Sequence, residues 1–296
     1  MSSVMKLAIG SIAVGALVLA LKTLAWWMTG SVALLSDALE STVNLAAAFA
    51  ALAAIRVAAR PADDNHPFGH HKAEFFSAVL EGVLIIVAAL FIFKEAYAGF
   101  FSPRVMERPF EGLAVNAVAT VINGGWAFVL IRQGRRRKSP ALVADGRHLW
   151  ADVVTSGGVA VGVLLAITTG WWVLDPIMAA LVAVNVLWSG FRLVRESLSG
   201  LMDEAVSEEI LATIRRIIAS EANGAVQAHD LKTRHAGSAV FIEFHLVVPG
   251  DMTVFDAHEI CDRIEAALKS AVSGARISIH VEPEHKEKLN GIMVMD

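Results

Sequence analysis

Six apolar stretches, each about as long as a lipid bilayer is thick, occupy the first two thirds of this chain and limit what it can fold into. They cover residues 5–28, 31–55, 74–100, 111–132, 141–168 and 172–195. A helix needs ~20 apolar residues to cross the hydrocarbon core, and it satisfies its backbone polar groups internally. Because 55% of the residues are hydrophobic and only 18% are charged, the sequence predicts an α-helical membrane protein with a six-transmembrane-helix bundle.

Three polar positions in these stretches have a simple structural interpretation. The first stretch is too long for a signal peptide and has no convincing cleavage site, so we predict that it is the first span. Lys22 stands close to Trp26 and Trp27, and we expect its long side chain to reach the membrane interface; the alternative is a role in a transport path. Asp175 followed by Pro176 is typical of an N-cap and a first helical position at the start of the sixth span.

The basic residues predict the orientation of the bundle in the membrane. They gather in the links that follow the second, fourth and sixth spans: Arg56, Arg60, Lys72, Arg132, Arg135, Arg136, Arg137, Lys138, Arg192 and Arg195. The links on the opposite side are short, apart from residues 101–110 with Arg104 and Arg108. Since short cytoplasmic links carry an excess of Lys and Arg, both termini are expected in the cytoplasm.

The composition changes at about residue 203, where the long apolar runs stop. Residues 1–202 are therefore expected to form the transmembrane domain, and residues 203–296 a small cytoplasmic domain. In the second part the patterns predict helices at 206–221 and 254–272 and strands at 226–235, 238–248 and 275–282. This α-β-β-α-β order predicts an α+β domain with its helices on one face of a small sheet.

Two pairs of polar residues lie inside apolar stretches. His148 and Asp152 are four residues apart, and so are Glu40 and Asn44, so each pair shares one face of a helix. Such side chains are costly to bury in a membrane unless they pair, bind a cation or line a wet cavity. If the two helices face each other, the four residues could surround one divalent transition metal such as zinc.

The link between the second and third spans offers another candidate set. Asp63, His66 and His70 are spaced so that one carboxylate and two imidazoles could bind zinc or a similar ion. The alternative is a solvated loop whose imidazoles bind metal only adventitiously.

The predicted cytoplasmic domain is rich in imidazoles. His280 and Glu282 lie two apart on one strand and so point to the same face of the sheet. A regulatory metal site could use five residues: His229, His245, His258, His280 and Glu282. His235 and His285 are expected to be ordinary surface residues.

Other classes of function are disfavoured. The single cysteine, Cys261, excludes an intramolecular disulfide and a cysteine-based zinc cluster within one chain. A net charge of −4 without a basic patch argues against a nucleic-acid partner. No GxxxxGK[ST] nucleotide loop occurs, which disfavours a pump driven by ATP; an enzyme is not expected, and neither is a cofactor.

Several of these segments resemble the cation diffusion facilitators, six-span metal/proton antiporters with a ferredoxin-like or metallochaperone-like cytoplasmic domain. The resemblance covers nearly the whole chain and is greatest to the bacterial zinc and ferrous-iron efflux branch. It rests on Pro61-Ala62-Asp63-Asp64-Asn65-His66, Phe68-Gly69-His70, His148-xxx-Asp152, Ala228-His229-Asp230-Leu231 and Ile279-His280.

The resemblance implies roles for the candidate residues. The four membrane residues would form the transport site, although that branch more often has two aspartates on the second span, where this chain has Glu40 and Asn44. The loop set would form an interface site and the cytoplasmic set a two-metal site, in which Glu282 replaces the usual aspartate. Lys72 and Asp203 match positions of an ion-pair interlock between subunits, so the resemblance implies a homodimer.

The expected function is therefore efflux of a divalent transition metal, Zn²⁺ or Fe²⁺, across the bacterial cytoplasmic (inner) membrane by proton antiport. Glu40, His148 and Asp152 must lose protons to bind metal and would carry the protons back. The alternatives are a Mn²⁺, Co²⁺ or Ni²⁺ exporter of the same family, a metal channel without proton coupling, and a membrane-anchored metal sensor. Besides metal ions, protons and membrane lipid, the expected partner is a second copy of the chain.

Overall fold

The computed structural model describes residues 3–102, 105–136 and 140–294. Arg104, Arg137 and Lys138, which contributed to the orientation argument, lie outside the described residues. The chain divides into two compact units. The helical unit comprises Met1–Ala53 and Ser77–Val194, and the C-terminal unit comprises Ala54–Phe76 and Arg195–Asp296.

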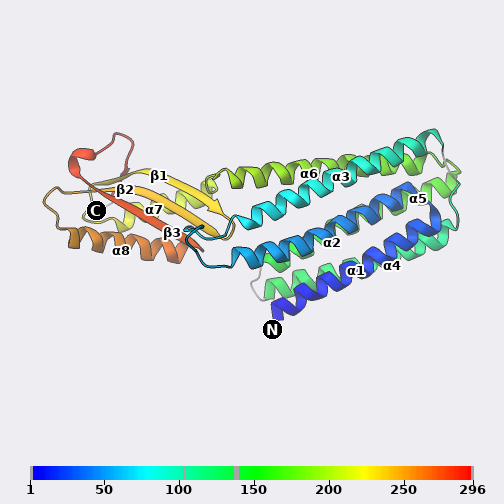
Figure 1. The fold of residues 1–296 in the computed structure, drawn as a ribbon, viewed down its shortest axis with the longest axis horizontal. Helices are drawn as coiled ribbons and strands as arrows, with labels where there is room; N and C mark the ends of the chain where they lie inside the picture. Colours follow the sequence, from blue (N-terminus) through cyan, green and yellow to red (C-terminus); the bar gives the residue numbers. More distant parts are fainter. Residues whose placement is uncertain (1–2, 103–104, 137–139, 295–296) are drawn as a thin grey trace. The chain divides into compact units, whose positions relative to one another are not determined.

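Six long helices match the six predicted spans (Figure 1). Each is long and apolar enough to cross a membrane, which confirms the predicted six-helix architecture. The helices run a few residues beyond most of the predicted limits, because polar residues at their ends continue the helical backbone. Their bounds are α1 Ser3–Thr29, α2 Val32–Ala58, α3 Ala73–Phe101, α4 Pro109–Arg136, α5 Pro140–Thr169 and α6 Leu174–Leu201.

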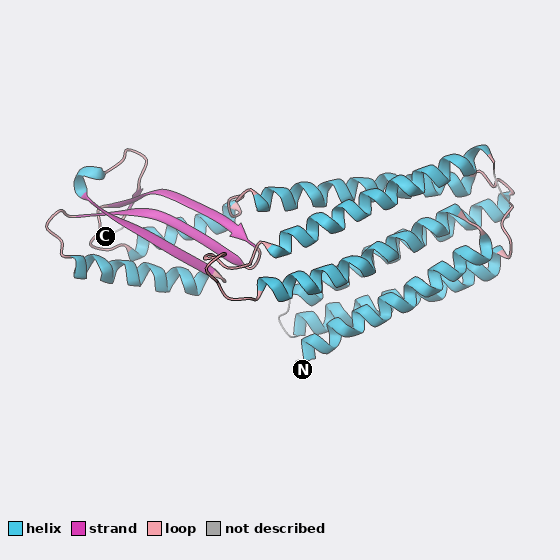
Figure 2. Ribbon diagram, in the orientation of Figure 1, coloured by secondary structure: helices cyan, strands magenta, loops and turns pink. Residues whose placement is uncertain are grey.

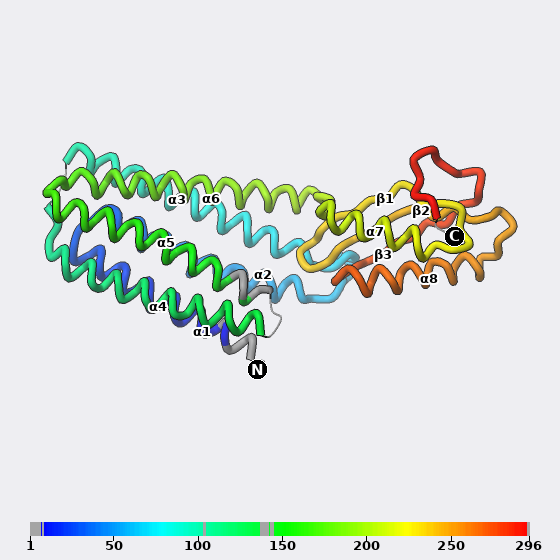
Figure 3. Tube along the Cα trace, turned by 180° about the vertical axis from the view of Figure 1, so that it is seen from behind, coloured from blue at the N-terminus to red at the C-terminus, as the bar shows by residue number. Residues whose placement is uncertain are grey.

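Close helix contacts within the helical unit depend on small residues. Figure 3 shows α4 beside both α1 and α5, and it packs against both. Where α3 meets α6, a Cβ added to Gly82 would lie 3.1 Å from the backbone oxygen of Gly190. Helices in lipid associate through this kind of close backbone packing, because no hydrophobic force drives them together.

The position of Asp175 before Pro176 predicted that it is the N-cap of its own helix, and this prediction is wrong. Asp175 lies within the first turn of α6, is 6% exposed, and its carboxylate accepts hydrogen bonds from the start of α2. The donors are the Ser31 hydroxyl at 2.5 Å, the Val32 N–H at 2.7 Å and the Ala33 N–H at 3.2 Å. The carboxylate therefore satisfies otherwise unpaired N–H groups of α2 and ties that helix to α6.

Lys22 also differs from the expectation, because its side chain turns into the bundle instead of reaching the interface. It is 2% exposed, and its ammonium group donates to Asp37 Oδ1 at 2.7 Å. The Asp37 carboxylate within the bundle pairs with the Lys22 ammonium group, so this group does not need to reach the membrane interface. The spacing of residues in the sequence does not reveal this partner.

The C-terminal unit contains the predicted α-β-β-α-β order and two short additions (Figure 2). Its main elements are α7 Glu208–Glu221, β1 Gln227–Ala236, β2 Ala239–Val248, α8 Val254–Ala271 and β3 Ala275–Pro283. The 3-10 turn η1 Glu284–Lys286 and strand β4 Ile292–Met293 follow, in a segment for which no element was predicted. The sheet order is β3-β2-β1-β4; β2 runs antiparallel to β1 and parallel to β3.

The hydrophobic core of this unit lies on one face of the sheet. Ile214 and Ile218 of α7 and Ile264 of α8 are fully buried against Ile242 and Phe244 of β2. Since successive strand residues point to opposite faces, the odd-numbered residues of β2 face away from the two helices. The sheet therefore presents a second face on which polar side chains can gather.

Candidate metal centres

The structure brings the four predicted membrane residues to one cavity. This membrane cluster consists of Glu40 and Asn44 on α2 and of His148 and Asp152 on α5, and it lines a cavity of about 180 Å³. Side chains of α3 and α6 complete the wall. The Asn44 amide donates to Asp152 Oδ2 at 2.9 Å. Spacing had paired the residues on each helix, and the structure places the two pairs against each other.

In the membrane cluster, at least one carboxylate oxygen has no hydrogen-bond donor from the part of the protein that the structure describes and is free to bind a cation. Asp152 is 6% exposed, and Glu40 Oε2 is buried with no hydrogen-bond partner among the described residues. A buried carboxylate oxygen without a donor is costly, and a bound cation would offset that cost. Two carboxylates, one amide oxygen and one imidazole suit a divalent transition metal.

The predicted loop residues also converge. This loop cluster comprises Asp63, His66 and His70, and one possible ligand atom from each lies within 4.8 Å of the others. Asp63 Oδ1 is 3.1 Å from His66 Nδ1, and Asp63 Oδ2 is 3.4 Å from His70 Nε2. The His66 backbone N–H donates to Asp63 Oδ1 at 2.7 Å and, as the largest cause, lowers the pKa of that carboxyl. The loop thus holds an ionised carboxylate between two imidazoles.

Four of the five predicted cytoplasmic residues gather on the face of the sheet opposite α7 and α8. His229, His245 and His280 are register partners across β1, β2 and β3, so their rings form a row. Glu282 lies within reach of all three: its carboxylate is 3.2 Å from His229, 3.4 Å from His245 and 3.7 Å from His280. These four residues are called the sheet cluster.

The structure does not bring His258 to the sheet cluster. Its ring lies on α8, is 74% exposed, and is 3.7 Å from Asp262 one turn away. The structure instead brings Asp230 close to the sheet cluster. The sequence analysis did not assign Asp230 as a metal ligand, although it directly follows His229. Asp230, His229 and His245 each offer a ligand atom within 4.8 Å of the others.

A β-bulge explains why Asp230 was missed. The register of β1 and β2 shifts between His229 and Lys232, and Asp230 has a φ of 52°. Strict alternation would place Asp230 on the face opposite His229, whereas the bulge re-aims its side chain. Lys288 donates to Asp230 Oδ2 at 2.6 Å, and this hydrogen bond lowers the pKa of the Asp230 carboxyl.

Lys72 and Asp203 pair within one chain. The Lys72 ammonium is 2.9 Å from Asp203 Oδ1 and also donates to the Leu201 carbonyl oxygen at 3.1 Å. Arg234 donates to the same Asp203 oxygen at 3.0 Å. A further role of this pair between subunits stays a prediction.

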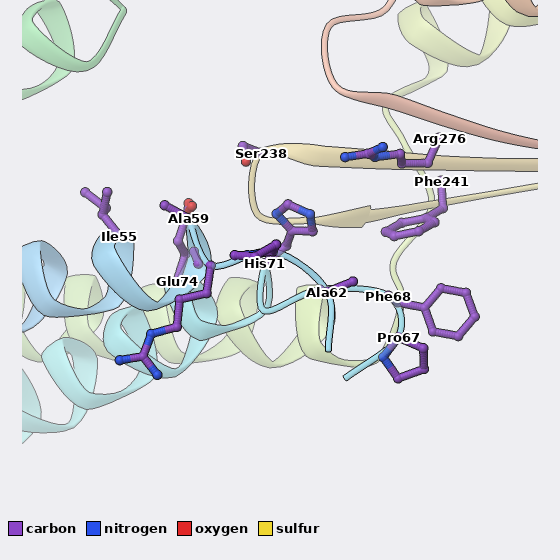
Figure 4. A pocket seen from close by; sticks show the side chains of 14 residues that line it. Ile55, Ala59, Ala62, Pro67, Phe68, His71, Glu74, Ser238, Phe241 and Arg276 are labelled. Atoms are coloured by element: carbon purple, nitrogen blue, oxygen red, sulfur yellow. The ribbon is translucent and has the colours of Figure 1, made fainter. Parts of the chain in front are cut away.

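A separate cavity of about 680 Å³ in the C-terminal unit has different chemistry (Figure 4). The figure shows Phe68 and His71 of the 59–74 segment near Phe241 and Arg276 of the sheet. Its lining residues include one imidazole, His71, and one carboxylate, Glu74. One ligand of each type is too few for a closed metal site.

Six spans with polar side chains around a common cavity, followed by a small α/β domain, define this chain as a membrane transporter. It belongs to the cation efflux family, the cation diffusion facilitators that its sequence resembles. Residues 8–202 match the family model of the cation efflux transmembrane domain. Residues 206–284 match that of the cation efflux protein, cytoplasmic domain.

Curated relatives cover nearly the whole chain. An uncharacterized transporter of Synechocystis, sll1263, is 47% identical over 93% of this chain and 89% of its own length. The cation-efflux pump FieF of Escherichia coli O127:H6 is 34% identical over 95% of this chain and 93% of its own length.

Solved structures match part of the chain. The Zn form of CzrB is 47% identical and covers 29% of this chain and 98% of that chain, with a TM-score of 0.28. The metal-bound C-terminal domain of the CzcD transporter from Thermotoga maritima is 26% identical and covers 27% of this chain and 93% of that chain, with a TM-score of 0.25.

Proposed function

We propose that this protein exports a divalent transition metal, Zn²⁺ or Fe²⁺, from the bacterial cytoplasm in exchange for protons, and that it works as a homodimer with both termini in the cytoplasm. The observation that carries the proposal is the convergence of Glu40, Asn44, His148 and Asp152 on one cavity inside the helical unit. Membership of the cation efflux family supports export as the direction.

Charge balance favours a divalent substrate. Glu40 and Asp152 together supply two negative charges when ionised, which neutralise one divalent ion in a medium of low dielectric constant. The imidazole of His148 adds a nitrogen ligand and favours a transition metal over magnesium or calcium.

Proton exchange follows from the same side chains. A carboxylate or imidazole binds metal only in its deprotonated form, so protons must leave the membrane cluster when metal enters. After the metal departs, Glu40, His148 and Asp152 can take up protons from the outer side. His148 is the best suited carrier because its ordinary pKa lies near neutrality.

The loop and sheet clusters are proposed as additional metal sites outside the transport path. The close approach of Asp63 to both imidazoles supports the first. The contacts of Glu282 with three histidines support the second. Metal bound at these sites would stabilise the C-terminal unit, and we propose that Lys72 and Asp203 contribute to the dimer as well as to the single chain.

The decisive experiment uses proteoliposomes that contain the purified protein, a metal-sensitive dye and a pH-sensitive dye. Zn²⁺ or Fe²⁺ added on one side should enter the lumen while protons move in the opposite direction. His148→Ala and Asp152→Ala should abolish both signals. Asp145→Asn is the matched control, since Asp145 lies on the same helix but accepts its hydrogen bond from Ser11.

Each competing function predicts a different result. Metal entry without proton counterflow would identify a channel or uniporter. Metal binding without any flux would identify a membrane-anchored sensor. Faster flux of Mn²⁺, Co²⁺ or Ni²⁺ than of Zn²⁺ and Fe²⁺ would keep the antiport mechanism and replace the proposed substrate.

A further inference from the structure

A second polar group lies in the helical unit, outside the set of proposed ligands. Lys22 of α1 donates to Asp37 Oδ1 of α2 at 2.7 Å, and Ser156 of α5 donates to the same oxygen at 2.8 Å. Lys22 is 2% and Asp37 is 1% exposed. The second carboxylate oxygen, Asp37 Oδ2, is buried without a hydrogen-bond partner among the residues that the structure describes.

This group lies one helical turn from the membrane cluster on two helices. Asp37 precedes Glu40 by three residues on α2, and Ser156 follows Asp152 by four on α5, so each shares a helix face with a proposed ligand. Charges about one helical turn apart interact strongly in a medium of low dielectric constant. A charge change at the pair therefore reaches the site where metal would bind.

Stability alone is a poor explanation for a buried ion pair in a membrane. Removing two charges from water costs about as much as their attraction returns, and apolar residues of similar volume often stabilise a protein equally well. Ionisable groups within membrane-spanning helices more often serve a transport path. The helix tie in the same unit is already supplied by Asp175, whose carboxylate caps α2.

We propose that Lys22 is a positioning residue that neutralises the Asp37 carboxylate and keeps it from binding the metal. The metal then meets the negative charge of only two carboxylates, Glu40 and Asp152. The proposal rests on the proposed function, because it concerns the charge of the membrane cluster. Without Lys22, Asp37 would act as a third negative charge beside Glu40 and would retain a divalent ion too strongly for release. Without Asp37, the ammonium of Lys22 would repel the ion.

The two halves of the pair therefore have opposite effects on metal affinity, which a structural role does not produce. Lys22→Met should tighten Zn²⁺ binding and Asp37→Asn should weaken it, each on the order of tenfold. The double variant Lys22→Met/Asp37→Asn should return close to the wild-type affinity. Lys22→Arg keeps the charge and should change affinity little.

The measurement uses the full chain in detergent, titrated with Zn²⁺ in competition with a zinc-sensitive dye. His70→Ala and His245→Ala are introduced throughout to remove the loop and sheet clusters. The titrations span mildly acidic to mildly alkaline pH, because a lone buried charge neutralises itself at one end of that range. Among the described residues, Glu40, His148 and Asp152 are titratable groups close to the pair, and Glu81 interacts with His148. All four are unchanged in the variants of Lys22 and Asp37.

Two controls separate the possible failures. Asp175→Asn should lower the melting temperature and leave Zn²⁺ affinity unchanged, as expected for a purely structural carboxylate. Asp152→Ala should abolish the measured binding; if it does not, the site in the proposed function is wrong, whatever the pair does.

Affinity shifts of the same sign in both single variants, or unchanged affinity in both at every pH, would overturn the proposal. If Lys22→Met does not fold, the comparison between Asp37→Asn and the double variant decides. The double variant must then bind Zn²⁺ more tightly than Asp37→Asn does. Both variants lack the Asp37 carboxylate, but only Asp37→Asn keeps the Lys22 ammonium group, which repels the ion. Equal affinities of these two variants would also overturn the proposal.

Discussion

The Asn44 side chain donates a hydrogen bond to Asp152 Oδ2 at 2.9 Å and thereby joins α2 to α5 across the proposed transport site. The amide nitrogen is engaged as a donor, so Oδ1 is the atom that Asn44 can offer to a metal. Asn44 thus both orients one carboxylate ligand and supplies a neutral oxygen.

Asn44→Asp should raise the affinity for divalent metal and make transport more sensitive to external pH. The substitution adds a third carboxylate, which must lose its proton when metal binds and regain it after metal release in each cycle. The measurement is flux against pH for Zn²⁺ and Fe²⁺ in both proteins. An unchanged pH profile together with an unchanged metal preference would show that Asn44 is not a ligand.

Asn44→Leu tests the orienting role of the same residue. It leaves a largely buried Asp152 oxygen without its donor, and we expect a loss of about 1–3 kcal/mol in stability. Thermal unfolding in detergent without metal measures the loss. A variant as stable as the wild type would show that the hydrogen bond to Asp152 contributes little.

The sheet cluster predicts that residues 203–296, produced alone, gain thermal stability on addition of zinc. A ligand that binds only the folded state stabilises it by mass action. His229→Ala and His245→Ala should remove most of the shift in melting temperature, whereas His235→Ala, the control in β1, should retain it. An unchanged melting temperature at saturating zinc would contradict the assignment.

His258 and Asp230 distinguish the expected ligand set from the one that the structure assembles. Asp230→Asn should reduce the zinc-induced shift, since its carboxylate lies beside His229 and His245. His258→Ala should change the shift less than His229→Ala, because its ring pairs with Asp262 on its own helix. Equal losses for His258 and His229 would show that α8 also supplies a ligand.

The length of the apolar stretches was sufficient to predict the six spans, because a helix that crosses a bilayer needs a long apolar run. Residue patterning was sufficient to predict the α-β-β-α-β order, because burial imposes a regular pattern on the helices and strands of a small domain. Spacing within one helix also predicted the pairs Glu40/Asn44 and His148/Asp152. It could not predict partners on other helices: Lys22 was expected at the interface and Asp175 at its own helix start, yet each interacts with α2 or its N-terminus. Asp230 was missed because a bulge breaks the strand alternation.

The ion pair between Lys72 and Asp203 predicts a specific pH dependence of stability. Hydrogen bonds from Lys72 and then Arg234 lower the pKa of the Asp203 carboxyl below its ordinary value. Because the folded-state pKa is the lower one, the stabilisation is fully present above the unfolded-state value of about 4 and is lost as the pH falls through the folded value.

Asp203→Asn should therefore destabilise residues 54–76 together with 195–296 at neutral pH, and the difference from the wild type should shrink progressively under acidic conditions. Asparagine is the suitable replacement, because Asp203 has a φ of 63° and asparagine tolerates this left-handed conformation. Thermal unfolding of the full chain at a series of pH values measures the difference, with Asp251→Asn as a control at an exposed turn. A difference that stays constant down to strongly acidic pH would show that Asp203 stabilises the unit through its backbone conformation and not through its charge.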